Sequence, residues 1–357
     1  VDLGLPGILP VANKEAARRA LFTAMALHCE TPDEVIFDRK NYYYPDLPKG
    51  YQLTQFFNPV GVDGKIEIDV NGTKKEVLIH DIHLEEDAAS LDHYYNTSTI
   101  DYNRAGVPLI EIVTKPCISN GDEAVKYLEE LKETLFYLGV SDCKIEEGSM
   151  RADVNVSVSK DNKLGTKCEV KNIGSISSVK TAIDYEINRQ IDLLEKGVKI
   201  EEETRRFDAK TSSTILMRKK EVGNDYRYFP EPDIPYLYLE DSYINEVKES
   251  IKLLPNERRN IYKSKNISDI NIEKLIANKS LSDYLNKYID FDIDFKIASN
   301  ILLGDITSYL NKNNNTVYKV FHEYMDNEKA GYDKDFLLRF SNIKNNTFIN
   351  VPQINKM

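Results

Sequence analysis

Three segments repeat apolar residues every three or four positions, which is the spacing of an amphipathic α-helix. The predicted helices span residues 13–27, 122–138 and 179–195. Asn and Ser cap helix N-termini, and Gly readily adopts the left-handed conformation that ends a helix. Asn13 can therefore cap the first helix, and Gly139 ends the second. Ser177 or Ser178 can cap the third helix, and Gly197 ends it.

Alternating polar and apolar residues in the segment 148–158 predict a strand with one core face and one polar face. After a turn, residues 166–172 predict a second strand, and the two can pair as a hairpin. Its polar face carries Arg151, Asp153, Asn155 and Lys171. A solvated sheet face has a similar pattern. However, Asp, Asn and Arg are poor strand formers at alternate positions, which favours a surface that faces a ligand.

Glu111 stands in the run 107–113, which otherwise has the pattern of a strand buried on both faces. A carboxylate in such a place needs a counter-charge, hydrogen-bond donors or a metal, or its pKa rises until it takes up a proton. A second acidic cluster, residues 83–87, follows another predicted strand, and a polar loop with Arg104 lies between the two. This arrangement favours a Mg²⁺ site with room for phosphates. The alternative is a buried ion pair of Glu111 with Arg104 or a lysine.

Basic and aromatic residues occur together in two segments, residues 38–51 and 205–233. Such mixtures suit phosphates and stacked bases. The alternative for each segment is a packed loop of prolines and tyrosines. In the second segment, the candidates for contacts with RNA phosphates and bases are Arg205, Arg206, Arg218, Tyr226 and Arg227.

Composition limits the class of protein without identifying its function. The 357 residues carry a formal net charge of -11, which argues against nucleic-acid binding by the whole surface. No stretch approaches the roughly 20 apolar residues of a membrane span, so no membrane contact is expected. The four cysteines are far apart and form no C-x-x-C pair, so we expect neither a zinc site nor a disulfide framework. We therefore expect the protein to be in a reducing compartment.

Six segments together resemble the GatB family, the B subunits of the aspartyl/glutamyl-tRNA amidotransferase. They are residues 3–10, 37–46, 83–88, 146–153, 203–206 and 225–233. The resemblance covers about residues 2–240 and is weaker from about 253 to 310. It implies an α+β fold, with a largely antiparallel cradle domain over residues 1–245 and a helical domain over residues 246–357. The compartment it implies is the bacterial cytoplasm or an organelle of bacterial descent.

The resemblance also implies a reaction. Members of the family use ATP to phosphorylate the side-chain carboxylate of Glu-tRNA(Gln) or Asp-tRNA(Asn), and ammonia from an amidase partner, a glutaminase, then displaces the phosphate. A small third subunit is a further expected partner. By resemblance, Glu86 and Glu111 are expected to bind Mg²⁺, and Lys40 is expected to act beside them. The expected wall of the site comprises His83, Arg104, Arg151, Asp153, Asn155, Lys171 and Asn172.

The chain departs from the family pattern at both ends. The family's N-terminal strand with Glu-x-His and its C-terminal tail domain have no counterpart in this sequence, so the metal site is expected to be incomplete as it stands. Ala89-Ser90 also replaces the usual Gly-Lys, and Cys117-Ile118 replaces the usual Asp-Ile. Two alternatives to an active amidotransferase component therefore remain. One is a catalytically incomplete relative that binds RNA or acts as a scaffold, and the other is an unrelated carboxylate ligase.

Overall fold

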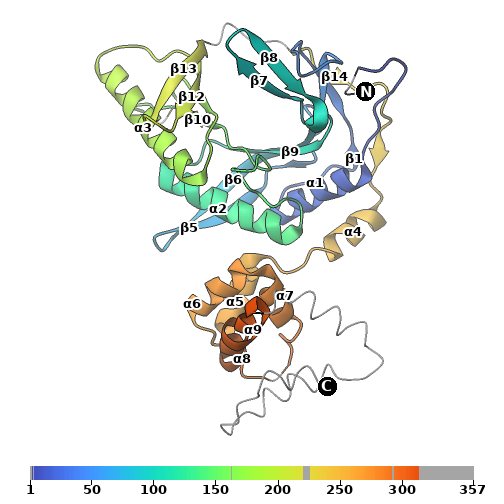
Figure 1. Cartoon of the computed structure of the whole chain (residues 1–357), viewed down its shortest axis with the longest axis vertical. Coiled ribbons are helices and arrows are strands. Elements are labelled where there is room, and N and C mark those ends of the chain that lie inside the picture. Colours follow the sequence, from blue (N-terminus) through green and yellow to red (C-terminus); the bar gives the residue numbers. More distant parts are fainter. Residues whose placement is uncertain (1, 3, 162, 220–225, 292, 313–357) are drawn as a thin grey trace. The chain divides into compact units, whose positions relative to one another are not determined.

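The computed structural model describes residues 2, 4–161, 163–219, 226–291 and 293–312 (Figure 1). The chain separates into two compact units, residues 1–252 and residues 253–357. The first unit combines helices with mostly antiparallel sheets, and the described part of the second is helical, which confirms the α+β class. The position at which we expected the division, after residue 245, falls inside helix α4 (Asp241–Glu249), which packs against α1 (Lys14–Ala26) in the first unit.

The centre of the first unit is a sheet built on the long strand β6 (Thr73–Glu86). This strand pairs antiparallel with three others, β4 (Gly61–Val62), β5 (Lys65–Val70) and β9 (Pro108–Thr114). A shift of register between Ile79 and Asp81 divides β6 into two parts. The first part pairs with β5, and the second pairs with β4 and β9.

Two helices cover one face of this sheet (Figure 1), and we call the opposite face, which they do not cover, the open face. They are α1 and α2 (Gly121–Leu138). The Asn13 side chain caps α1 by accepting from the Ala16 amide at 3.0 Å, as predicted. Gly139 ends α2 in the left-handed conformation at φ 70°, also as predicted. Apolar side chains of the sheet, including Ile79, Ile82 and Leu84, join those of the two helices in one core.

A second sheet has the strand order β10 (Val154–Val156), β11 (Cys168–Lys171), β12 (Glu203–Asp208) and β13 (Ser213–Lys219). The predicted hairpin is confirmed as the antiparallel pair β10–β11, although the first strand is shorter than the predicted span 148–158. Helix α3 (Ile176–Glu195) connects β11 to its parallel neighbour β12 and packs on this sheet. Its N-cap is Ser175, whose hydroxyl accepts from the Ser178 amide at 3.1 Å. The prediction of Ser177 or Ser178 as the cap was wrong, because the helix begins three residues earlier than its apolar stripe.

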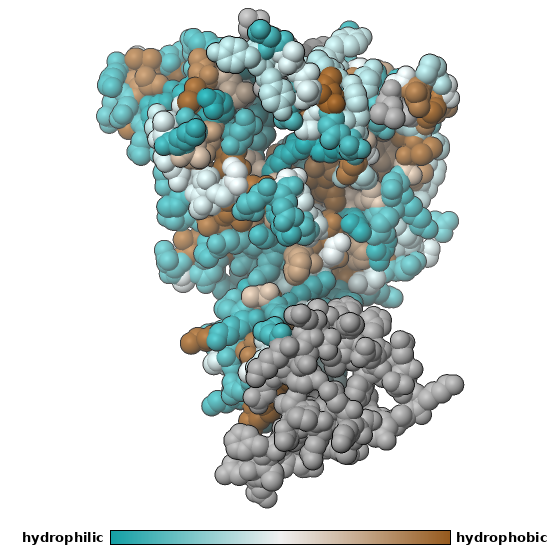
Figure 2. Space-filling model, in the orientation of Figure 1, coloured by the Kyte–Doolittle hydropathy of each residue, from teal (hydrophilic) through white to brown (hydrophobic). Residues whose placement is uncertain are grey.

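Shorter elements complete the first unit. A three-stranded sheet has the order β14 (Phe229–Pro230), β2 (Asp38–Asn41) and β3 (Tyr51–Thr54). Strand β1 (Glu34–Val35) pairs with β15 (Leu237–Tyr238), and β7 (Ser90–Tyr94) forms a hairpin with β8 (Thr97–Asp101), followed by the 3₁₀ helix η1 (Tyr102–Arg104). Figure 2 shows hydrophobic residues on the viewed face of this unit as separate patches among hydrophilic ones.

The described part of the second unit consists of short helices. They are α5 (Pro255–Ser264), α6 (Asp269–Ala277), α7 (Lys279–Asn286), α8 (Phe295–Ile301), the π-helix η2 (Leu302–Ile306) and α9 (Thr307–Lys312). Buried Tyr262, Leu275 and Leu281 pack between these helices. Buried Arg258 bridges α5 and α7 through an ion pair with Asp283 at 2.6 Å. Within the part of the chain that the structure describes, none of the helices has the length and apolar character needed to span a membrane.

Candidate active site

The open face of β6 and β9 carries several ionisable side chains. Glu111 of β9 lies directly opposite His83 of β6 in the antiparallel register, and Glu85 lies opposite Leu109. Because side chains alternate along a strand, Asp81, His83 and Glu85 project from the same face as Glu111. The intervening residues Ile82 and Leu84 project into the core.

Both ring nitrogens of His83 face acceptors. Nδ1 lies 2.9 Å from the backbone carbonyl of Gln55, and Nε2 lies 2.5 Å from Oδ1 of Asp81. An imidazole that donates from both nitrogens is the protonated, cationic form. Burial opposes this charge, but the hydrogen bond and negative charge of Asp81 outweigh burial and raise the pKa of His83 to about 9. His83 is therefore an imidazolium at neutral pH.

Glu111 and Glu85 form the acidic part of this face. Although Glu111 has exposed surface, its carboxylate is partly withdrawn from water, and this desolvation and the negative charge of Glu85 raise its pKa, while the positive charges of His83 and Lys40 partly offset the rise. Glu85 is held in place by Thr54, whose hydroxyl donates to Oε1 at 2.5 Å, and by Gln52, whose amide donates to Oε2 at 3.3 Å. A cation placed between Glu85 and Glu111 would be favoured by the negative charges of both carboxylates.

The strand that carries Glu111 differs from the prediction. We expected a strand buried on both faces, but β9 pairs only with β6 among the described strands, and Glu111 is exposed. Pro108 and Leu109 are exposed as well. The apolar run 107–113 is that of an edge strand with one covered face.

Glu86, which the sequence paired with Glu111, lies elsewhere. Its carboxylate forms an ion pair with Lys49 and accepts from the Leu53 amide at 2.8 Å. Burial raises the pKa of Glu86 to about 6, although Lys49 opposes the shift. Strand alternation places Glu86 on the opposite face from Glu85. The structure therefore places Glu85, and not Glu86, beside Glu111, and the alternation within residues 83–86 was a signal that could have identified it.

Lys40 lies on β2, opposite Gln52 of β3. Its Nζ lies 5.3 Å from the centre of the Tyr226 ring, a cation–π contact. The positive charge of Lys40 partly offsets the rise in the pKa of Glu111, so Lys40 interacts electrostatically with the acidic face. No carboxylate among the described residues lies within ion-pair distance of Lys40, which leaves its ammonium group available to a ligand.

The donor set fits a divalent cation only in part. Mg²⁺ commonly takes one or two carboxylates and completes its shell with water and substrate phosphates. Glu85 and Glu111 provide such a pair. Among the residues that the structure describes, no group of three or more His, Cys, Asp and Glu side chains is arranged to hold a metal ion.

Apart from His83, the residues predicted to form the wall of the site lie in two separate groups. Arg104 of η1 and Arg151 both contact Oδ2 of Asp87, at 3.1 and 3.3 Å. The structure does not bring Arg104 to Glu111, so Arg104 is not the buried counter-charge considered above. On the second sheet, Lys171 bridges Asp153 at 2.8 Å and Glu169 at 3.1 Å. Asn155 is exposed on β10, and Asn172 is exposed just after β11 at φ 61°.

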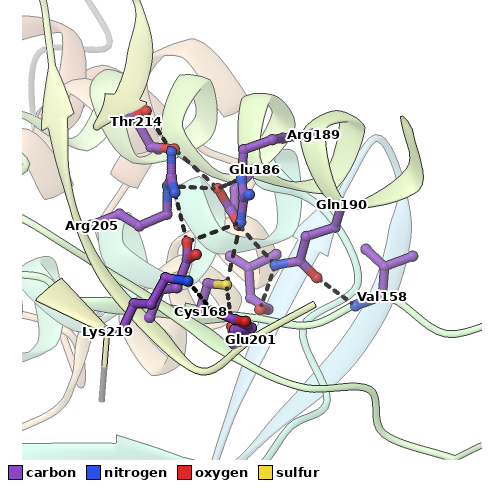
Figure 3. A network of polar contacts seen from close by, with 11 residues as sticks. Val158, Cys168, Glu186, Arg189, Gln190, Glu201, Arg205, Thr214 and Lys219 are labelled. Carbon is purple, nitrogen blue, oxygen red and sulfur yellow. Dashed lines mark hydrogen bonds and ion pairs between the residues drawn. The ribbon is translucent and has the colours of Figure 1, made fainter. Parts of the chain in front are cut away.

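Arg205, predicted to bind tRNA, is instead buried in a polar network between α3 and the second sheet (Figure 3). Its guanidinium group donates to the Thr214 hydroxyl at 2.8 Å and pairs with Glu203 at 2.6 Å. Glu186, fully buried on α3, accepts from Thr214 at 3.0 Å and pairs with Arg189 at 2.6 Å. Arg205 therefore cannot contact RNA while the network is intact, and that prediction was wrong.

The other predicted tRNA-binding residues have different environments. Arg206 and Arg218 are exposed on β12 and β13. The ring of Tyr226 packs edge-on against that of Tyr42, with 6.0 Å between the ring centres. This contact favours the alternative of a packed loop of prolines and tyrosines. Arg227 is exposed, and its backbone carbonyl accepts from the Asn41 side chain at 2.8 Å. Residues 220–225 of the predicted basic segment lie outside the described residues.

Comparisons with known proteins match the sequence of this chain to a family. The profile of the GatB/GatE catalytic domain covers residues 1–245, which is most of the first unit and includes every strand of the acidic face. The chain belongs to the GatB/GatE catalytic domain family.

Individual relatives of this family are named as B subunits of the aspartyl/glutamyl-tRNA(Asn/Gln) amidotransferase. The chain is 47% identical to that of Bacillus licheniformis over 315 residues, which is 87% of this chain and 66% of the relative. It is 48% identical to that of Bacillus anthracis over the same length and 46% identical to that of Macrococcus caseolyticus over 322 residues, which is 89% of this chain and 68% of that relative. The chain thus spans about two thirds of the length of the curated relatives it matches.

Proposed function

We propose that this chain is the carboxylate-activating part of a tRNA-dependent amidotransferase, in the place that the B subunit has in the relatives. Its substrates are Glu-tRNA(Gln), Asp-tRNA(Asn) or both, together with ATP. The observation that carries the proposal is the face shared by β6 and β9, where Glu85 and Glu111 lie together and Lys40 extends a positive charge toward them. Membership of the GatB/GatE catalytic domain family and the names of the relatives support it.

The reaction has two steps that balance. An oxygen of the amino-acid side-chain carboxylate attacks the γ-phosphorus of ATP, ADP leaves, and an acyl phosphate forms. Ammonia then attacks the acyl carbon, inorganic phosphate leaves, and the ammonia nitrogen loses a proton as the amide forms. A carboxylate is a poor acyl donor, and phosphorylation supplies the leaving group that the second step needs. Mg²⁺, when bound, neutralises charge on the transferring phosphoryl group.

Each residue of the face has a role in this proposal. Glu85 and Glu111 would hold the divalent cation, because the third carboxylate of this face, Asp81, already forms ion pairs with His80 and His83. Lys40 would pair with phosphate oxygens, since its ammonium group has no carboxylate partner among the described residues. His83 is a positioning residue: its fixed positive charge, opposite Glu111, favours ionised carboxylates on this face.

Ammonia would come from a partner, because the sequence contains neither a glutaminase-like Cys and His signature nor a Ser-Ser-Lys amidase signature. The partners are an amidase, which acts as the glutaminase, and a small third subunit. The relatives are named as B subunits, which supports a complex of several chains. The bacterial relatives also favour the bacterial cytoplasm or an organelle of bacterial descent as the compartment.

One observation favours a second candidate. No group of three metal-ligating side chains occurs within the described ranges, which suits a catalytically incomplete relative that binds RNA or acts as a scaffold. Such a protein would bind the tRNA but would not cleave ATP.

The experiment that separates the two supplies ammonium chloride in place of the partner amidase. The purified chain is incubated with Mg²⁺, ATP and Glu-tRNA(Gln) or Asp-tRNA(Asn), and the release of phosphate and the formation of Gln-tRNA or Asn-tRNA are measured. We expect both products to appear with ammonium and neither with glutamine alone. Binding of the tRNA with no phosphate release would favour the scaffold instead.

A further inference from the structure

Glu85 is a buried carboxylate without an ion-pair partner in the described part of the chain. It is 8% exposed, and no Lys, Arg or His side chain within the described ranges lies at ion-pair distance from it. Its neighbour Glu86, which is equally buried, has Lys49 as a partner. A buried negative charge is costly unless an opposite charge or hydrogen bonds compensate it. Hydrogen bonds from neutral groups therefore hold Glu85 in the fold, and its charge is left for a ligand to balance.

These hydrogen bonds come from the side chains of one strand, β3. Thr54 donates from its hydroxyl to Oε1 of Glu85 at 2.5 Å, and Gln52 donates from its side-chain amide to Oε2 at 3.3 Å. Both donors are buried and project from the same face of β3, because one residue separates them along the strand. Each carboxylate oxygen thus has one donor. Since an ionised carboxylate can accept about four hydrogen bonds, about two acceptor positions remain for a ligand.

The same strand contacts Glu86 in a different way. The backbone amide of Leu53 donates to Oε1 of Glu86 at 2.8 Å, and the Gln52 side chain donates to the Glu86 carbonyl at 2.7 Å. A hydroxyl has one proton to donate, and Thr54 donates it to Glu85. Thr54 is therefore the residue of β3 through which the contacts of Glu85 can be changed while those of Glu86 are kept.

We propose that Thr54 is a positioning residue that orients Glu85 toward a divalent cation on the open face, an inference that rests on the proposed function. Because the hydroxyl holds Oε1, the carboxylate has a fixed orientation before any cation binds, and less conformational entropy is lost on binding. Glu111, on the neighbouring strand, provides the second carboxylate. Partners that hydrogen-bond to metal-binding side chains typically contribute about 10- to 100-fold to metal affinity. The role belongs to the hydroxyl of Thr54 and not to its methyl group.

The test measures equilibrium binding of Mn²⁺, a spectroscopic substitute for Mg²⁺, by the purified full chain without nucleotide or tRNA. Thr54→Val and Thr54→Ala remove the hydroxyl, and Thr54→Ser keeps it. Thr23→Val is the matched control, because Thr23 is a fully buried threonine of α1 whose hydroxyl donates to the Arg19 carbonyl at 2.9 Å. The melting temperature of each chain is recorded, since a threonine with a merely structural role would change the melting temperature and not the affinity for Mn²⁺.

We expect Thr54→Val and Thr54→Ala to raise the dissociation constant of Mn²⁺ by about 10- to 100-fold. Thr54→Ser should remain within about threefold of the parent, and Thr23→Val, whatever its melting temperature, within about twofold. Affinity like that of the parent in either folded variant without the hydroxyl would overturn the inference and leave the proposed function standing. A loss in Thr54→Ser equal to that in Thr54→Val would also overturn it, because the methyl group and not the hydroxyl would then be responsible.

The parent chain separates this inference from the proposed function. If the parent does not bind Mn²⁺, the inference is overturned. Phosphate release from ATP with aminoacyl-tRNA and ammonium, measured on the same preparation, then decides the second question. Release of phosphate would leave the proposed function standing, and its absence would overturn both.

Discussion

His83 and Glu111 lie directly opposite one another on β6 and β9, so an imidazolium faces a carboxylate across the antiparallel pair. This relationship answers the question raised by the sequence, which required a counter-charge for Glu111. The counter-charge comes from the neighbouring strand and is itself fixed by Asp81 and by the Gln55 carbonyl. The acidic face therefore carries its own cation before any ligand binds.

The first prediction concerns pH and His83. Its pKa in the folded chain, about 9, is above the ordinary value of 6.5, so its contribution to stability is complete below about pH 6.5 and is lost as the pH rises toward 9. The shift corresponds to at most about 3 kcal/mol. Urea unfolding between pH 6 and 9 should show stability falling in the parent chain and a flatter profile in His83→Asn. His28→Asn is the control, because His28 is exposed, and it should behave like the parent. If the stability of His83→Asn fell with pH as steeply as that of the parent and of His28→Asn, the raised pKa would not belong to His83.

The second prediction concerns the repulsion between Glu111 and Glu85. Partial desolvation and the negative charge of Glu85 raise the pKa of Glu111, which means that the ionised form is disfavoured in the folded chain. At pH 8 without divalent cations, Glu111→Gln should stabilise the chain, and because Glu111 is exposed, screening limits the gain to less than about 1 kcal/mol. Adding Mg²⁺ should raise the melting temperature of the parent but not of Glu111→Gln, since only the parent keeps both carboxylates. Glu146→Gln, at an exposed loop position, should behave like the parent. An equal response to Mg²⁺ in all three chains would place the cation elsewhere.

The third prediction concerns the buried network of α3. Glu186→Ala removes the fully buried carboxylate that pairs with both Arg189 and Arg205 and leaves them only Glu203, and removing one partner of a buried ion pair typically costs about 3–5 kcal/mol. Thermal or urea unfolding checks the loss. Glu195→Ala, at an exposed position of the same helix, should change stability by less than about 0.5 kcal/mol. Equal effects of the two substitutions would show that the network contributes little.

The fourth prediction separates Arg206 from its neighbour. Arg206 is exposed, so Arg206→Ala should weaken tRNA binding and reduce the slope of log affinity against log salt by about 0.7–0.9, the value for one phosphate contact. Arg205→Ala should act mainly on stability and lower the unfolding temperature, because it breaks the buried network. Filter binding across a range of KCl concentrations measures the slope. An unchanged slope in Arg206→Ala would remove this residue from the RNA interface.

The sequence predicted the features that depend on local pattern. Asn13 and Gly139 mark their helix ends because capping is decided within a few residues, and the hairpin β10–β11 follows from alternation and a turn. It did not predict features that depend on pairing between distant segments. Lys49 reaches Glu86 only because β3 lies beside β6, and Arg205 meets Glu186 only because α3 packs on the second sheet. A charged side chain therefore cannot be assigned to a ligand or to an ion pair from its neighbours in sequence alone.

The central claim is that Glu85 and Glu111, and not Glu86, form the carboxylate pair of the reaction site. The decisive measurement is ATP hydrolysis stimulated by aminoacyl-tRNA, with ammonium present, in Glu85→Gln, Glu86→Gln and Glu111→Gln. Melting temperatures are recorded beside it, because Glu86→Gln also disturbs the Lys49 ion pair. Glu85→Gln and Glu111→Gln should each lower the rate by about 10²–10³, the usual cost of losing one electrostatic contact at a developing charge. Folded Glu86→Gln should keep the rate within about tenfold of the parent. Loss of hydrolysis in folded Glu86→Gln, with turnover like that of the parent in Glu85→Gln, would contradict the account.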